Sequence, residues 1–94
     1  MAKKLIKKEM MSVEGEMCFW VNNGPVLKNM NELCDAFRTM DQNVFDYHVS
    51  SEKNDFAKWV DEALHDADLA KKLLKYTDPA SMLKVIEAHI KKNY

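Results

Sequence analysis

Apolar residues recur at intervals of three and four positions along most of the chain after residue 28, and this spacing predicts helices. Five segments show it, and a residue that favours helix N-termini precedes each. The expected caps are Asn29, Asp41, Ser51 or Asn54, Asp66 or Asp68, and Asp78. The clearest apolar stripe follows the third cap and consists of Phe56, Trp59, Val60, Ala63, Leu64 and Ala67. The last helix begins with Pro79, which suits a first helical turn.

The segment before these helices predicts a short β-hairpin. Residues 17–21 are apolar and aromatic, the turn residues Asn22-Asn23-Gly24-Pro25 follow, and a short apolar pair comes next. Two strands alone are marginally stable, so the hairpin must pack on the helices. Because neighbouring strand residues point to opposite faces, we expect either Phe19 or Trp20 to leave the core.

The predicted fold is mainly α, a compact bundle of about five short helices with a short N-terminal β-hairpin. A small α+β domain is the alternative. The 94 residues fit one domain, divided into a basic N-terminal segment, residues 1–15, and a single globular helical domain, residues 16–94.

Several features of the sequence favour the cytoplasm. The basic start of the chain is not followed by the apolar stretch of a secretion signal. No apolar run approaches the roughly 20 residues that span a bilayer. Cys18 and Cys34 lie among apolar neighbours without a CxxC spacing, which favours buried free thiols in a reducing compartment.

Charge is unevenly distributed along the chain, although the formal net charge is only −1. Residues 1–10 sum to +3, residues 11–70 to −8, and residues 71–94 to +4. Such blocks can attract one another within a monomer, between copies, or on a charged partner. The candidate interaction residues of the basic ends are Lys3, Lys4, Lys7, Lys8, Lys71, Lys72 and Lys75, and the aromatic candidates are Phe19 and Trp20.

Catalytic and metal-binding patterns are missing from the sequence. It has no Gly-rich phosphate loop and no nucleophile motif, so we expect neither an enzyme nor a cofactor. His65 lies among the acids Asp61, Glu62, Asp66 and Asp68, which could hold a divalent cation. Acids before a helix restart more often serve as caps and as a solvated face, so no metal site is assigned.

A motif in the middle of the chain resembles that of a known family. Tyr47-His48-Val49 and Asn54-Asp55-Phe56-Ala57-Lys58-Trp59-Val60 are followed by Asp68-Leu69-Ala70. This is similar to a small archaeal and bacterial domain family of unknown function with a YHV…KNDFAxWV…LA pattern, and 19–24 and 29–33 match its opening. The resemblance covers roughly residues 16–75. It implies a prokaryotic, compact domain and brings no catalytic residues.

The motif residues also have a structural interpretation. Asn54 and Asp55 begin a helix whose Phe56 and Trp59 face the core. His48 lies on the apolar face of its own helix, which favours a hydrogen-bonded core histidine. A hydrogen bond from His48 to Asn54 or Asp55 could fix the turn at 50–53.

These observations favour a non-enzymatic protein–protein interaction module, acting as an adaptor, a regulator or a self-associating structural subunit. The alternative is a nucleic-acid- or ribosome-associated accessory protein that uses the Lys-rich ends. Nucleic-acid binding is disfavoured because a sequence pI near 6.3 and the acidic middle block oppose phosphate binding.

Overall fold

Five helices follow a short hairpin in the computed structural model, which describes residues 9–94. A 3-10 turn, η1 (Gly15–Met17), precedes the strands β1 (Phe19–Trp20) and β2 (Val26–Leu27). The helices are α1 (Met30–Thr39), α2 (Gln42–His48), α3 (Asp55–Glu62), α4 (Ala67–Leu73) and α5 (Pro79–Asn93). The prediction of a mainly α fold with a short N-terminal hairpin is therefore confirmed.

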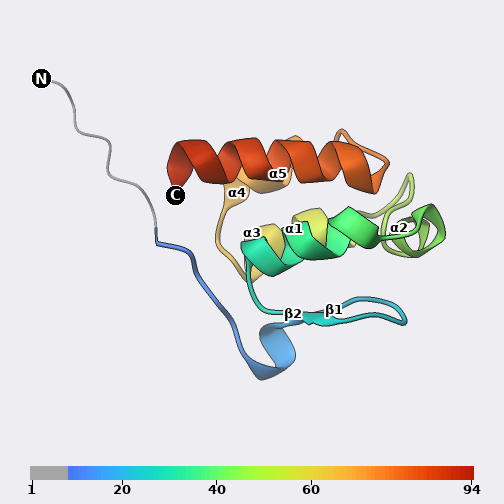
Figure 1. Ribbon diagram of the computed structural model, residues 1–94, viewed down its shortest axis with the longest axis horizontal. Coiled ribbons are helices and arrows are strands. Elements are labelled where there is room, and N and C mark those ends of the chain that lie inside the picture. Colours follow the sequence, from blue (N-terminus) through green and yellow to red (C-terminus); the bar gives the residue numbers. More distant parts are fainter. Residues whose placement is uncertain (1–8) are drawn as a thin grey trace, which may run out of the picture.

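The elements pack as a helical bundle with the hairpin on one side. α5 lies alongside α1, and α3 and α4 form a pair behind them (Figure 1). The two strands are antiparallel and pair Phe19 with Leu27 and Trp20 with Val26. The hairpin lies on the side of α1 away from α5, so the bundle covers only one of its faces (Figure 1).

Side-chain caps begin four of the five helices, and all four cap residues were among those expected from the sequence. Asn29 accepts a hydrogen bond from the Glu32 amide at 2.9 Å, and Asp78 accepts one from the Ser81 amide at 2.9 Å. Asn54, not Ser51, caps α3 and Asp66, not Asp68, caps α4. Asp41 precedes α2 as expected but makes no side-chain cap bond.

One helix is shorter than the sequence predicts. The apolar stripe from Phe56 to Ala67 reads as a single helix, but α3 ends at Glu62 and Ala67 belongs to α4. His65 adopts a left-handed backbone conformation with φ of +57°, and the Asp66 amide donates to the Val60 carbonyl at 3.1 Å. The chain changes direction between Glu62 and Ala67 because Asp66 caps a new helix. The three-and-four spacing of apolar residues continues across this break and does not reveal it.

The hairpin is also shorter than predicted. Residues 17–18 lie in and after η1, so each strand has only two residues. In the turn, Asn23 takes the positive φ, at +58°, while Gly24 serves close packing. A Cβ atom at Gly24 would lie 2.9 Å from the Val21 side chain, which real contacts essentially never allow.

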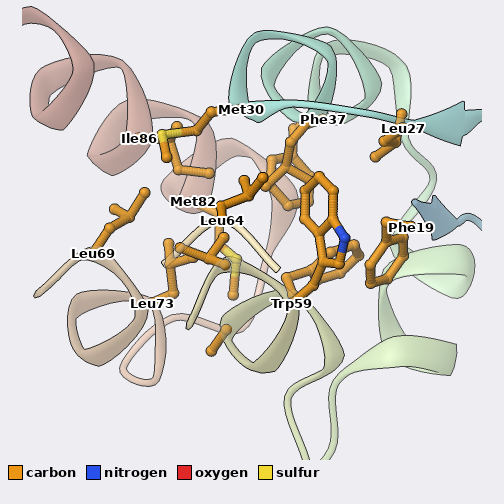
Figure 2. Close-up of a cluster of buried hydrophobic side chains, with 14 of the residues drawn as sticks. Phe19, Leu27, Met30, Phe37, Trp59, Leu64, Leu69, Leu73, Met82 and Ile86 are labelled. Carbon is orange, nitrogen blue, oxygen red and sulfur yellow. The ribbon is translucent and has the colours of Figure 1, made fainter. Parts of the chain in front are cut away.

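The core has an aromatic end beneath the hairpin and an aliphatic end between the helices. Phe19 and Trp59 lie side by side at the aromatic end, whereas Leu69, Leu73 and Ile86 lie at the other (Figure 2). Phe56 is at the centre of the aromatic group. Its ring centroid is 4.9 Å from those of Phe19 and Phe37 and 5.6 Å from that of Phe45.

His48 fastens the hairpin turn to the helices. Its Nε2 accepts a hydrogen bond from the Asn22 amide at 3.1 Å, so its Nδ1 carries the proton and donates to Asp55 at 3.0 Å. The ring is buried and packs against Phe19 and Phe56. The expectation of a hydrogen-bonded core histidine is confirmed, and its partner across the 50–53 turn is Asp55.

We predict that His48→Ala lowers the free energy of unfolding by about 3 kcal/mol. It opens a cavity in the aromatic cluster and leaves the Asn22 amide without its acceptor. Asp55→Asn is the milder variant, since an amide oxygen can still accept from Nδ1. Urea unfolding followed by circular dichroism measures both, and equal stability of His48→Ala and the wild-type chain would refute this role.

Candidate functional site

Trp20 is the most exposed large apolar side chain of the described residues, at 66% of its possible exposure. Its neighbour Phe19 points inward and is 7% exposed. This is the split that strand alternation predicts. Phe19 was named with Trp20 as a candidate contact, but it belongs to the core and offers no surface.

Further exposed apolar side chains accompany Trp20. Val26 is its cross-strand partner and is 40% exposed, so the two share the outward face of the hairpin. Met17, just before β1, is 49% exposed. We call Met17, Trp20 and Val26 the hairpin face. Of these three residues, only Trp20 was a candidate from the sequence, and Val26 joins it through the strand register.

The backbone beneath the hairpin face is held by bonds to distant elements. Trp59 donates from its indole Nε1 to the Met17 carbonyl at 2.7 Å. At the other end, the Asn22 amide donates to His48. Because Phe19 and Val21 are buried on either side of Trp20, the backbone position of Trp20 is fixed by the core.

The residues before the hairpin also contact the domain. The Val13 amide donates to the Lys28 carbonyl at 2.9 Å, and Met10 and Val13 pack against the core. Cys18 contacts the Val13 carbonyl through its sulfur at 3.7 Å. The described part of the N-terminal segment therefore contacts the domain through Met10 and Val13, with Val13 bonded at the end of β2.

The predicted lysines fall into two groups. Lys3, Lys4, Lys7 and Lys8 lie outside the described residues. Lys71, Lys72 and Lys75 are all exposed, but only the first two lie in α4, and Lys75 follows its end. Lys72 extends to within 3.2 Å of Nδ1 of His89, whereas Lys71 lines a groove between α3 and α4.

A buried polar cluster lies where α5 meets the start of α4. Nε2 of His89 is 2.8 Å from the Asp66 carboxylate, and both residues are almost completely buried. Lys72 and Asn93 approach the other ring nitrogen, each at 3.2 Å. Since both are donors, Nδ1 accepts and Nε2 donates to Asp66. No sequence pattern indicates this cluster, because its central pair, Asp66 and His89, lies 23 positions apart.

Asp66 is held in its ionised form by its partners. Burial by itself raises the pKa of this carboxyl. Hydrogen bonds from the Tyr94 hydroxyl, the Leu69 amide and His89 outweigh burial and bring the pKa below its usual value. The same contact and burial raise the pKa of Tyr94. The arrangement joins the last turn of α5 to the N-terminus of α4.

The acids near His65 do not converge. Asp66 turns inward to His89, while Asp61, Glu62, His65 and Asp68 are exposed. Among residues 9–94, no three His, Cys, Asp or Glu side chains are grouped as metal ligands would be. Both cysteines are buried free thiols, and burial raises the pKa of Cys34 to about 11.

The remaining motif residues fix helix positions. Asn54 accepts from the Ala57 amide at 3.0 Å and donates to the Leu73 carbonyl at 3.2 Å, so it joins the start of α3 to the end of α4. Phe56 and Trp59 are buried, as predicted.

Comparison with known proteins identifies a family but no activity. The model described as "Family of unknown function (DUF5752)" matches residues 8–92, a longer stretch than the sequence motif covers. No curated protein and no solved structure matches the chain. Within the described residues, no helix is long and apolar enough to cross a membrane.

We predict that Asp66→Asn lowers the free energy of unfolding by about 2 kcal/mol at pH 7. An amide cannot accept from Leu69, His89 and Tyr94 without turning its NH₂ towards one donor.

The same variant changes the response to acid. Because the native pKa of Asp66 lies below the unfolded value, the unfolded chain is protonated first on acidification. The stabilisation is full above about pH 4 and is lost as pH falls through the native pKa. Asp66→Asn should therefore lose less stability than the wild-type chain between pH 6 and pH 3. Parallel acid dependence in urea titrations of the two proteins would contradict the assignment.

Proposed function

The chain belongs to this family of unknown function, and we propose that it is a non-enzymatic protein–protein interaction module that binds its partner through the hairpin face. The observation that carries the proposal is the exposure of Trp20, at 66%, on a strand whose neighbouring side chains are in the core. Tryptophan is the residue type most enriched among the anchors that dominate binding energy at protein interfaces.

The rigidity of the hairpin supports this role. A partner that binds a mobile loop must offset the entropy lost when the loop is ordered. Here the bonds of Met17 to Trp59 and of Asn22 to His48 already fix the backbone on both sides of Trp20. The binding surface is therefore ordered before the partner arrives.

The border of the hairpin face also resembles that of an interface. Lys28 and Glu14, both exposed, lie 3.6 Å apart next to the strands, so a polar pair borders the apolar side chains. The charged groups would stay hydrated when a partner covers Trp20, Val26 and Met17. The partner would present a complementary apolar surface, either on another protein or on a second copy.

The state of the thiols fits a non-enzymatic protein of a reducing compartment. Cys34 has a pKa of about 11, so at neutral pH it is a protonated thiol and a poor nucleophile. Cys18 is buried beside the Val13 carbonyl. We therefore retain the cytoplasm as the proposed compartment, with no cofactor.

The test uses a photo-crosslinking amino acid at position 26, beside Trp20, in otherwise intact protein in cells. We expect a discrete adduct that is lost in the Trp20→Ala background. Trp20→Ala should change the free energy of unfolding by no more than about 0.5 kcal/mol, because the side chain is exposed. The control carries the crosslinker at Lys84, which is exposed on α5.

Each outcome has a defined meaning. An adduct of twice the chain mass would identify the self-associating form, and light scattering against concentration would confirm it. An adduct that disappears on nuclease treatment and survives Trp20→Ala would support the nucleic-acid alternative instead. Failure to form any adduct at position 26, or the same adduct with and without Trp20, would refute the proposal.

A further inference from the structure

A groove of about 330 Å³ runs along the outer side of the α3–α4 pair. Each helix, together with its cap, lines the groove with four residues at positions i, i+3, i+4 and i+7. These are Asn54, Ala57, Lys58 and Asp61 from the α3 segment, and Ala67, Ala70, Lys71 and Leu74 from the α4 segment. Such positions lie on one face of a helix. Two matching faces therefore form the groove, and their other sides supply the core.

The floor of the groove is apolar and shallow. Ala57 and Ala70 are 4% and 7% exposed, so only methyl groups separate an incoming segment from the two backbones. Leu74 lies at one end and is 64% exposed, nearly as much as Trp20. Small floor residues permit the close approach of another helix, and a large apolar residue at the end provides a contact for its side chains.

The lining of the groove carries more positive than negative charge, with Lys58 and Lys71 against Asp61. Lys58 and Lys71 are exposed, and within residues 9–94 neither has an ion-pair partner. Among the described residues, Asp61 is the one acid in the lining. An apolar floor between two unpaired ammonium groups is complementary to an apolar row bordered by carboxylates.

The shape of the groove is fixed at the end near Leu74. Asn54 caps α3 and donates to the Leu73 carbonyl, which ties the start of one helix to the end of the other. The separation of the two helices is thus set in the free protein. A helical ligand would meet a preformed site and would have to order only itself.

We propose that this groove binds an acidic amphipathic helix of a partner protein. The apolar row of that helix lies over Ala57, Ala70 and Leu74, and its carboxylates pair with Lys58 and Lys71. No aromatic ring from residues 9–94 lines the groove, and single-stranded nucleic acids use aromatic rings as a stacking surface. The proposal goes beyond the hairpin face and does not involve Trp20.

The experiment measures binding of a fluorescein-labelled helical peptide with a Leu row flanked by Glu, by anisotropy at low salt. A peptide of the same length with Lys in place of Glu is the matched probe. We expect only the Glu peptide to bind. The double variant Lys58→Glu and Lys71→Glu should weaken binding at least about tenfold, and Leu74→Ser should weaken it several-fold.

The controls separate this groove from general charge and from the hairpin face. Lys84→Glu makes a charge change on α5, and Trp20→Ala removes the anchor of the other surface; both should bind the Glu peptide as the wild-type chain does. All substituted side chains are exposed, and melting temperatures confirm that each variant folds.

Three results would overturn the proposal. The first is no binding of the Glu peptide at millimolar concentration, and the second is equal weakening by Lys84→Glu. The third is a mass that rises with concentration without peptide and returns to that of a monomer in the groove variants, which would assign the groove to a second copy. An oligouridylate that binds through the same lysines while the peptide does not would place nucleic acid there instead.

Discussion

The stacking of aromatic rings around Phe56 is the interaction on which the rest of the domain depends. Phe19 of the hairpin, Phe37 of α1, Phe45 of α2 and the His48 ring all contact this one buried side chain of α3. Four elements that are separate in the sequence thus meet at one ring. A two-residue strand pair has too few backbone bonds to be stable alone, and contact with Phe56 supplies the apolar burial that it lacks.

Polar groups then fix the geometry that apolar burial leaves open. His48 holds the hairpin turn against α2, and Asn54 holds the start of α3 against the end of α4. Asp66 joins α4 to α5. Each of these side chains bonds to at least two partners from different parts of the chain. Apolar contacts determine which faces are buried, whereas these hydrogen bonds determine how the elements are oriented on one another.

Most of the fold could be predicted from local sequence. Caps such as Asn29 and Asp78 and the three-and-four spacing of apolar residues identified all five helices, since these signals act within one or two turns. The break between α3 and α4 was the exception. The apolar stripe runs through it, and only the left-handed His65 interrupts the helix. The candidate cap Asp66 indicated where α4 begins, but the continuous apolar stripe did not show that α3 ends at Glu62.

The candidate surfaces were predictable to a smaller extent. Alternation along β1 showed that Phe19 and Trp20 face opposite ways, but their assignment required the contact of Phe19 with Phe56. Val26 required the strand register, and the α3–α4 groove required the packing of two helices. The Asp66–His89 pair joins residues 23 positions apart, and no periodicity relates them.

The attachment of the hairpin through His48 makes the position of Trp20 depend on the packing of the helices. His48 lies at the end of α2 and donates its second hydrogen bond to Asp55 at the start of α3, so the position of the turn depends on the packing of these two helices. A chain whose helices have formed but not docked would carry the Trp20 residue without displaying it at a defined position. A partner that selects the ordered indole therefore distinguishes the finished domain from its folding intermediates and from damaged copies.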